Sequence, residues 1–277
     1  MLRGKRALVT GSSSGIGAAV ARLLAAQGVD LVLTARRKEA LEQVAAECTT
    51  HGVRVEVVTG DLGRADAAAT VWAAATASGA VDILVNNAGF GYFRAFAAAD
   101  WQRDGELLQL NIATLVELSR RFVDAREGKT ERAYIVNIAS IAAYQSVPNF
   151  AVYAASKAFV RNFTEALHDE LRAVRSPISA TCICPGGTHT EFHAAAGAGD
   201  YSWLANASMK SAEAVAAITV RAMTKGKRNV IPGVLNKLSC WAVRLVPRRF
   251  ASWMASRVLG KPRAVALPSR TGSTLAS

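Results

Sequence analysis

The feature that most constrains this chain is a regular alternation of short β-rich runs with longer helical stretches. The apolar runs "RALVT" (6–10) and "DLVLTA" (30–35) are each followed by a segment long enough for a helix. Runs of the same kind stand at 54–61, 81–89, 132–140, 178–187 and 228–233. Nearly continuous Val, Ile and Leu is typical of strands buried on both faces. The pattern predicts an α/β fold, a doubly wound and mostly parallel sheet with helices on both faces.

A chain of 277 residues suits a single domain of this type. We expect a helix near 104–127 and a more irregular segment after the run at 178–187. The expected organisation is a catalytic and dinucleotide-binding domain at 1–232 with a substrate lid at about 191–210, a basic amphipathic helical extension at 233–260 and a flexible tail at 261–277.

The net charge of +12 suggests nucleic-acid binding until its distribution is considered. Residues 221–277 hold 12 of the 33 basic residues and none of the 21 acidic ones, so residues 1–220 hold 21 of each sign. The chain is a neutral body with a cationic C-terminal end. We therefore expect no nucleic-acid partner.

The four cysteines show no CxxC and no metal-ligand spacing. Cys182 and Cys184 stand two residues apart in a strand and share one face. We interpret all four as buried free thiols in a reducing cytosol and expect no metal. The apolar stretch at the N-terminus is too short for a signal peptide, and no run is long enough for a membrane span. A cytoplasmic protein is expected.

A glycine-rich turn, "TGSSSGIG" (10–17), follows the first strand and opens the first helix. Glycine allows a tight turn and close approach of the main chain, and a helix N-terminus presents free N–H groups to a pyrophosphate. The position of the motif between strand and helix indicates dinucleotide binding.

The second strand ends in "LTARRK", where an NAD-binding chain would carry an acid for the adenosine ribose. Arg36 and Arg37 stand there instead. Arginine pairs bidentately with phosphate, so this end favours the 2′-phosphate of NADP. Two solvated arginines at a helix start would be the alternative.

Polar residues follow the later strands too. Asp61 lies in "GDLG", residues 86–89 read "NNAG", and the fifth strand ends at Ser140. Asn111 lies among leucines in "LQLNIAT", where a polar side chain needs a partner. By itself "NNAG" could be a plain turn.

The stretch "YAASK" places Tyr153 and Lys157 one helical turn apart. Such a pair is common on solvated helix faces. Taken with the other motifs, however, it resembles, in order and spacing, the short-chain dehydrogenase/reductase family of the NADP-preferring type. The resemblance covers roughly residues 4–232.

The resemblance implies an enzyme that transfers hydride between the nicotinamide C4 of NADP(H) and a carbonyl or secondary-alcohol carbon; NAD is the less favoured cofactor. Tyr153 would be the acid/base, with Lys157 lowering the pKa of the phenol from its ordinary value of about 10. Ser140 would orient the substrate oxygen, and Asn111 would hold a water of a proton relay. The cofactor-binding residues would be Gly11, Ser12, Ser13, Gly15, Ile16, Gly17, Arg36, Arg37, Asp61, Leu62, Asn87, Ala88, Gly89, Tyr153, Lys157, Pro185, Gly186, Thr188 and Thr190.

Phe192, Tyr201 and Trp203 stand among small residues in the expected lid and favour an apolar or lipid-like substrate. They could equally serve only to pack the lid onto the body. His189 and His193 are isolated and are interpreted as lid residues. A ketoacyl-thioester reductase of the same family and a non-catalytic NADP-binding regulator remain alternatives. The family further implies a homodimer or homotetramer.

The cationic end, 234–260, predicts two helices separated at Pro247. Apolar residues recur at three- and four-residue spacing: Leu235, Leu238, Trp241, Ala242 and Leu245 in the first, Phe250, Trp253, Met254 and Val258 in the second. Arginines accompany both stripes. One hypothesis is peripheral contact with an anionic membrane surface. The other is packing on the body or on a second subunit.

Overall fold

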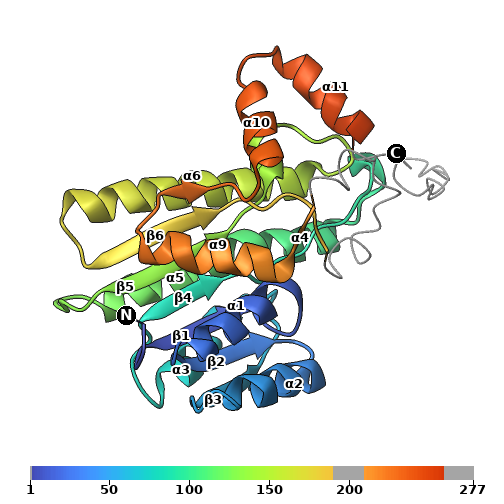
Figure 1. The fold of residues 1–277 in the computed structure, drawn as a ribbon. Coiled ribbons are helices and arrows are strands. Elements are labelled where there is room, and N and C mark those ends of the chain that lie inside the picture. The colour runs from blue at the N-terminus through green and yellow to red at the C-terminus, as the bar shows by residue number, and fades with distance from the viewer. Residues whose placement is uncertain (1, 190–208, 259–277) are drawn as a thin grey trace, which may run out of the picture.

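The computed structural model describes residues 2–189 and 209–258 and builds them around one seven-stranded sheet (Figure 1). Every pairing in this sheet is parallel, in the order β3-β2-β1-β4-β5-β6-β9. The strands are β1 Arg6–Thr10, β2 Asp30–Ala35, β3 Val55–Thr59, β4 Ile83–Asn86, β5 Ala133–Ile138, β6 Ile178–Ile183 and β9 Asn229–Val230. All seven lie within the predicted runs, and the predicted fold class is confirmed.

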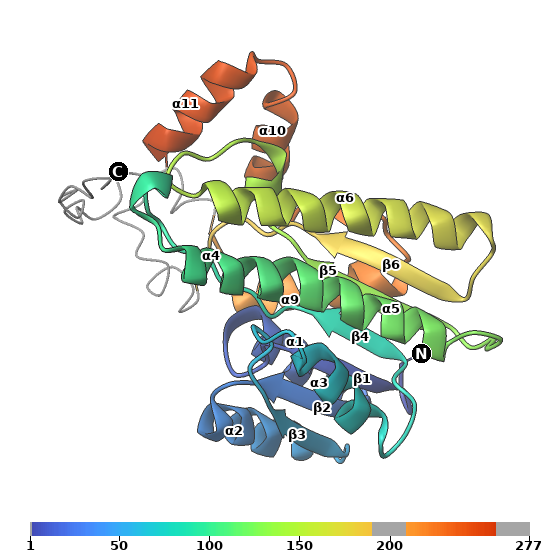
Figure 2. The ribbon, with the colours of Figure 1, turned by 180° about the vertical axis from the view of Figure 1, so that it is seen from behind.

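Helices cover both faces of the sheet, as Figure 1 and the view from behind in Figure 2 show. The α-helices are α1 Gly15–Ala26, α2 Lys38–Thr49, α3 Ala67–Thr76, α4 Trp101–Leu108, α5 Leu115–Ala125, α6 Ala151–Ala173, α9 Ala212–Thr224, α10 Val234–Ala242 and α11 Arg248–Val258. Short 3₁₀ turns span Phe96–Ala98 and Ile141–Tyr144. On one face α1 packs against α2 and α9; on the other, α3 packs against α5, and α4 against α6.

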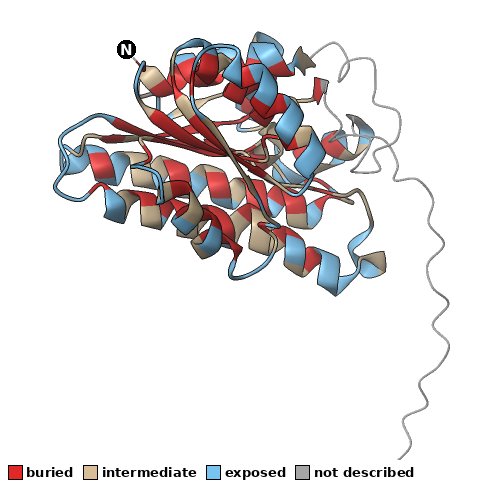
Figure 3. Cartoon of the chain, turned by 90° about the horizontal axis from the view of Figure 1, so that it is seen from below, coloured by how far each residue is buried: buried red, intermediate tan, exposed pale blue. Residues whose placement is uncertain are grey.

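Successive residues of a strand point into two different hydrophobic cores. In β1, Ala7 and Val9 lie in the core beneath α1 and α2, whereas Leu8 lies in the core beneath α3 and α5. Figure 3 shows the buried sheet between helices whose outer faces are exposed. Because both faces are covered, apolar residues stand at nearly every strand position.

Two parts of the fold differ from the prediction. The helix expected near 104–127 is α4 and α5, joined by a π-helical stretch at Gln109–Thr114. After β6, α9 is capped at its N-terminus by Ser211, whose Oγ accepts a hydrogen bond from the Ala214 N–H at 3.2 Å. The sequence of α9 is rich in alanine, so the spacing of its buried residues does not stand out as a helical pattern. A short parallel pairing of β7 Thr188–His189 with β8 Lys210–Ser211 is also absent from the predicted elements.

The C-terminal helices α10 and α11 are separated at Pro247, as predicted. In Figures 1 and 2 they lie beyond α6, away from the sheet. Across the described part of the chain, no helix has both the length and the apolar character needed to cross a membrane. The expected lid and tail fall almost entirely at 190–208 and 259–277, outside the described residues.

Candidate active site

The carboxyl ends of the parallel strands meet at one edge of the sheet, where open α/β folds bind ligands. At the end of β1 the chain turns sharply: Gly11 has φ +65° and Gly15 φ +56°, values that favour glycine. A Cβ on Gly17 would stand 2.4 Å from both Gly11 O and Asn87 Nδ2. The motif therefore needs glycine at 17 because the turn after β1 and the turn after β4 are in direct contact.

Thr10 and Asn87 hold these two turns together. The Thr10 Oγ1 accepts hydrogen bonds from the N–H groups of Asn87 and Ala88, both at 3.0 Å. In return the Asn87 side chain donates to Thr10 O and Gly11 O, both at 3.0 Å. The segment "NNAG" therefore ties two strand ends together.

The N-terminal end of α1, beside this turn, is suited to binding a pyrophosphate. Its N-cap residue, Ser14, makes no side-chain hydrogen bond to the helix N-terminus, so the first-turn N–H groups have no side-chain cap. The Ser12 hydroxyl is fully buried and has no hydrogen-bond partner in the described structure. Free helix N–H groups and a cradle that only glycine permits are what a dinucleotide phosphate requires.

Two arginines follow β2 on the same side of the site. Both Arg36 and Arg37 are exposed. The Arg37 guanidinium donates to Ser14 Oγ at 2.9 Å and to Ser13 Oγ at 3.4 Å. The second strand end therefore brings positive charge to the glycine-rich turn.

The end of β3 supplies a short polar turn. Asp61 is exposed and its Oδ1 accepts a hydrogen bond from the Gly63 N–H at 3.0 Å. Leu62 is buried, and its carbonyl accepts a hydrogen bond from the Thr114 hydroxyl at 2.8 Å. This turn is thereby fixed to the π-helical stretch that also carries Asn111.

Tyr153 and Lys157 lie on α6, and both side chains are buried. The Lys157 ammonium lies 5.7 Å from the centre of the Tyr153 ring and donates to Ile138 O, at the end of β5, at 2.9 Å. Burial lowers the pKa of Lys157 to about 8, with Cys182 and Cys184 acting weakly in the opposite direction. The pair is therefore buried inside the protein and does not lie on a solvated helix face.

Asn111 is buried at the centre of the π-helical stretch, a feature that often marks functional sites. Its Nδ2 donates to Phe90 O at 3.0 Å and to Ser156 Oγ at 3.1 Å, and its Oδ1 accepts from the Phe90 N–H at 3.1 Å. A Cβ on Gly89 would stand 2.9 Å from Asn111 Oδ1 and 3.3 Å from Lys157 Nζ. Asn111 and Lys157 thus converge on Gly89.

Ser140 and the turn after β6 complete this edge. Ser140 is partly exposed, and its Oγ accepts from the Ala142 N–H at 3.1 Å. Pro185 O accepts from the Ile141 N–H at 2.9 Å, and Thr188 Oγ1 donates to Gly186 O at 3.2 Å. Of the predicted catalytic and cofactor-binding residues, only Thr190 lies outside those that the structure describes; the lid residues Phe192, His193, Tyr201 and Trp203 lie outside them too.

An aromatic stack stands behind Tyr153. The rings of Phe150 and Tyr153 have centres 4.2 Å apart, and Phe93 stacks on the other side of Phe150, also at 4.2 Å. A cavity of about 20 Å³, enough for one water, lies beside this stack. It is lined in part by Tyr92 and Asp104, which are hydrogen-bonded to each other; burial is the main cause that raises the pKa of Tyr92.

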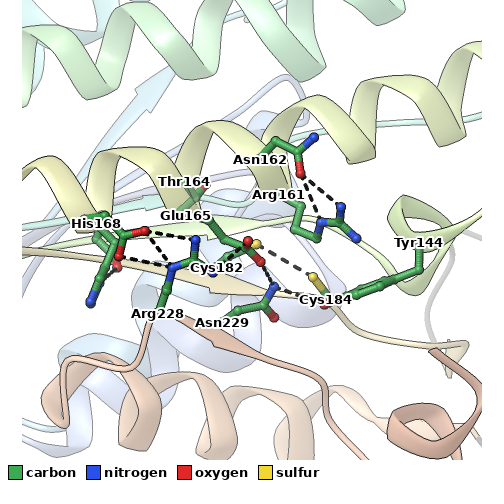
Figure 4. A network of polar contacts seen from close by, with 12 residues as sticks. Tyr144, Arg161, Asn162, Thr164, Glu165, His168, Cys182, Cys184, Arg228 and Asn229 are labelled. Carbon is green, nitrogen blue, oxygen red and sulfur yellow. Dashed lines mark hydrogen bonds and ion pairs between the residues drawn. The ribbon is translucent and has the colours of Figure 1, made fainter. Parts of the chain in front are cut away.

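A polar network joins α6 to the sheet edge near β6 and β9 (Figure 4). Arg228, just before β9, forms ion pairs with Glu165 at 2.8 Å and Asp169 at 2.9 Å on α6. Asn229 donates to the Tyr144 hydroxyl at 3.0 Å and to Glu165. This network holds α6 against the edge of the sheet at β9.

The four cysteines are free and buried, as predicted. The Sγ atoms of Cys182 and Cys184 are 3.7 Å apart, and this contact together with burial raises the pKa of Cys182 far above its usual range. Thiols of this kind are unreactive. Within residues 2–189 and 209–258, no group of three or more His, Cys, Asp or Glu is placed to hold a metal ion.

Two site residues are not found by sequence reasoning. Ser156 stands three residues after Tyr153, so its position was a usable signal. Asn236 offers none: it is buried on α10, and a Cβ on Gly186 would stand 2.5 Å from its Nδ2. Its Nδ2 also donates to Pro232 O at 2.9 Å. The C-terminal extension therefore packs directly against the turn after β6.

Comparison with known proteins places this site in a family. A family model described as "short chain dehydrogenase" matches residues 5–200. Dehydrogenase/reductase SDR family member 11 of Bos taurus is 36% identical over 196 residues, covering 69% of this chain and 77% of the relative. SDR family member 7B of Rattus norvegicus is 33% identical over 271 residues, covering 92% and 82%.

Among solved structures, a short-chain dehydrogenase from Sphingobium yanoikuyae in complex with NADPH superposes with a TM-score of 0.77. It is 26% identical, and the match covers 95% of this chain and 98% of that one. The strand-end geometry, the matched sequence and the shared fold agree. The chain belongs to the short-chain dehydrogenase family and is an oxidoreductase that acts on CH–OH and C=O groups with a nicotinamide cofactor.

Proposed function

We propose that the protein is an NADP(H)-dependent reductase or dehydrogenase of a ketone or secondary alcohol with an apolar, lipid-like body. The observation that carries this proposal is the buried pair Tyr153 and Lys157, 5.7 Å from ring centre to ammonium, at the edge where the glycine cradle opens. The dinucleotide cradle and the acid/base pair both stand at the carboxyl ends of the strands of one sheet.

Tyr153 gives a proton to the substrate oxygen in reduction and takes it back in oxidation. The positive charge of Lys157 favours the phenolate form of that tyrosine. Ser140 donates to the substrate oxygen and orients it toward the phenol. The nicotinamide, when bound, supplies or accepts the hydride.

Asn111 takes part in returning the proton to solvent. Its Oδ1 and the Lys157 ammonium both lie beside Gly89, so close that one small group at this point would contact both. A water held between them would receive a proton from Lys157. The hydrogen bonds of Asn111 to Phe90 and Ser156 fix the amide for this task.

NADP is preferred over NAD because Arg36 takes the 2′-phosphate, with Arg37 beside it on the glycine turn. The exposed position of both arginines and the contact of Arg37 with Ser13 and Ser14 support this assignment. Asp61 and Leu62 flank the adenine, Asn87, Ala88 and Gly89 the adenosine side, and Pro185, Gly186, Thr188 and Thr190 the carboxamide.

The apolar character of the substrate is supported by the rings that surround Tyr153. Phe93 and Phe150 form a continuous stack with it, and the partly buried Phe90 packs in the same cluster. A substrate whose oxygen meets Tyr153 therefore lies close to apolar side chains. We also propose a cytoplasmic homodimer or homotetramer; light scattering tests this, and a monomer would contradict it.

The test is a screen of ketones with NADPH and NADH and of secondary alcohols with NADP⁺ and NAD⁺, in parallel, in which cofactor fluorescence measures turnover. Turnover of at least one apolar ketone with NADPH is expected, and polar ketones of equal size should react more slowly. NADPH binding without turnover of any carbonyl or alcohol would favour the non-catalytic alternative. Faster turnover of acyl-carrier thioesters than of free ketones would favour the ketoacyl reductase.

A further inference from the structure

The outer side of the two C-terminal helices is an exposed apolar surface, here called the C-terminal apolar face. Its side chains are between 42 and 73% exposed. It consists of Val234, Leu235, Leu238, Trp241, Leu245, Phe250, Trp253 and Met254. Apolar surface gathered on adjacent helices marks a binding surface rather than ordinary scatter.

The body does not cover this face, because α10 and α11 use their other side to pack. The buried residues of α10 are Asn236 and Cys240, and those of α11 are Ala251 and Ala255. In each helix the two are four residues apart and so lie on one side. Of the packing hypotheses from the sequence, packing of the stripes on the body is therefore wrong.

The two helices that carry the C-terminal apolar face bear positive charge and no negative charge. Lys237 and Arg244 accompany α10, and Arg248, Arg249 and Arg257 lie on α11. All are exposed, and no acidic residue occurs from 221 to the end of the sequence. The Arg257 guanidinium lies 5.0 Å from the centre of the Trp253 ring, at the boundary between apolar and charged surface.

This charge pattern argues against a second copy of the chain as the occupant. A two-fold dimer brings the same patch of each subunit together, so every arginine would face a cationic partner surface. A nucleic acid would match the charge, but its phosphates would leave Leu238, Trp241 and Leu245 without apolar partners. An anionic lipid bilayer satisfies both features, since headgroups take the arginines and the acyl boundary takes the apolar side chains.

We propose that α10 and α11 dock the protein on the surface of an anionic lipid bilayer, with the C-terminal apolar face inserted at the headgroup–acyl boundary. An open groove of about 450 Å³ lies at its edge and is lined by Arg248, Arg249 and Trp253 together with Ser146 and Pro148. The groove can hold a lipid headgroup between two guanidinium groups. The proposal goes beyond hydride transfer and does not depend on it.

The experiment is co-sedimentation of the full chain with sucrose-loaded vesicles of phosphatidylcholine, with and without phosphatidylserine. Binding to the anionic vesicles is expected at about 50 mM salt and should weaken at about 500 mM, where the Debye length is only a few ångströms. Binding to pure phosphatidylcholine should be much weaker. Protein that stays in the supernatant at low salt overturns the proposal.

Two variants of the face separate specific docking from the general attraction of a basic protein. The pair Leu238→Gln with Trp241→Gln removes apolar contact, and the pair Arg248→Glu with Arg249→Glu reverses charge. Each should weaken partitioning at least about tenfold, because both terms contribute to interfacial binding. If the variant with Leu238→Gln and Trp241→Gln binds like the unaltered chain, binding depends only on general charge attraction and the proposal is overturned.

Matched controls carry the same changes elsewhere. Val174→Gln with Trp101→Gln alters two apolar side chains that are 75 and 77% exposed outside the face. Lys129→Glu with Arg172→Glu changes the charge by the same amount. Both should bind within about twofold of the unaltered chain if the face is specific.

A spectroscopic measurement on the unaltered chain guards against variants that fail to fold. Vesicles with brominated acyl chains should quench tryptophan fluorescence, because Trp241 and Trp253 reach the acyl boundary. Absence of quenching in sedimenting protein would overturn insertion. Sedimentation velocity completes the test: an oligomer that dissociates with Leu238→Gln and Trp241→Gln would mean that a second copy covers the face.

Discussion

The two halves of the site are built from different parts of the polypeptide. The cofactor half consists mainly of main chain: Gly11 and Gly17 approach so closely that a Cβ has no room, and Asn87 bonds to carbonyl groups. The catalytic half consists of side chains, with Tyr153 stacked on Phe150. Main chain gives a cradle that any such cofactor can use, whereas side chains give a site that substitution can retune. We therefore expect the cofactor half to determine NADPH affinity and the catalytic half to determine turnover.

The largest expected effect comes from Tyr153→Phe, which removes only the phenol oxygen of the catalytic half. Turnover should fall about 10³-fold or more while NADPH affinity stays within about threefold, because acid–base catalysis is lost and the stack is kept. Steady-state NADPH oxidation and fluorescence titration measure the two quantities. Tyr134→Phe, in β5, is the control. Retention of a tenth of the turnover would refute the assignment of Tyr153.

Lys157 provides the next effect, seen in stability rather than in rate. Burial lowers its pKa to about 8, whereas a lysine in an unfolded chain titrates near 10.4. Between these values the unfolded state binds the extra proton, so the protein gains stability as pH rises. Relative to Lys157→Met, the free energy of unfolding should increase by about 3 kcal/mol from pH 8 to above pH 10.

Urea unfolding at several pH values measures this difference, and subtraction removes the ionisable groups that lie away from position 157. Lys129→Met, at an exposed position, should show no such trend. The free energy of unfolding of the unaltered protein minus that of Lys157→Met should rise with pH. If this difference stays flat or falls, the ammonium is not buried in solution.

Gly17→Ala tests the cofactor half by adding one methyl group. Its Cβ would meet Gly11 O and Asn87 Nδ2 at 2.4 Å, so the two turns must separate. A loss of about 1–3 kcal/mol of stability and a tenfold or larger loss of NADPH affinity are expected. Gly105→Ala is the matched control, because the added Cβ would meet no neighbouring group within 4 Å and the position is helical. This substitution should stabilise the protein by about 1 kcal/mol. Unchanged NADPH affinity in Gly17→Ala would contradict a main-chain cradle.

Arg36→Ala is expected to give the smallest effect, because the residue is exposed. The unaltered protein should prefer NADPH over NADH at least about tenfold, and the variant should lose most of that preference, about 1.4 kcal/mol. Ratios of kcat/KM for the two cofactors measure it, with Arg120→Ala as control. A natural preference for NADH would exclude the assignment.

The two halves also differ in how far the sequence predicts them. Gly11 and Gly17 belong to the glycine-rich turn after the first predicted strand, and Asn87 lies in the motif at the end of the fourth. Parallel strands bring their ends together, so local pattern locates these residues. Phe93 and Phe150 meet only because the loop after β4 folds over α6, and no periodicity describes that path. The π-helical stretch around Asn111 changes the helix phase by one residue, which an apolar spacing of three and four does not reveal. Asn236 meets Gly186 across fifty positions of chain.

That last contact makes α10 common to two surfaces. Asn236 fills the space beside Gly186, at the turn after β6, while Leu238 and Trp241 of the same helix belong to the exposed face. If a bilayer shifts α10, it alters NADPH affinity by some factor, and thermodynamic reciprocity requires NADPH to alter bilayer affinity by the same factor. Titrating each ligand in the presence of the other measures both factors. Two factors equal to one would exclude such a linkage, whereas unequal factors would show only that a titration had not reached equilibrium. Asn236→Ala should bring both factors toward one.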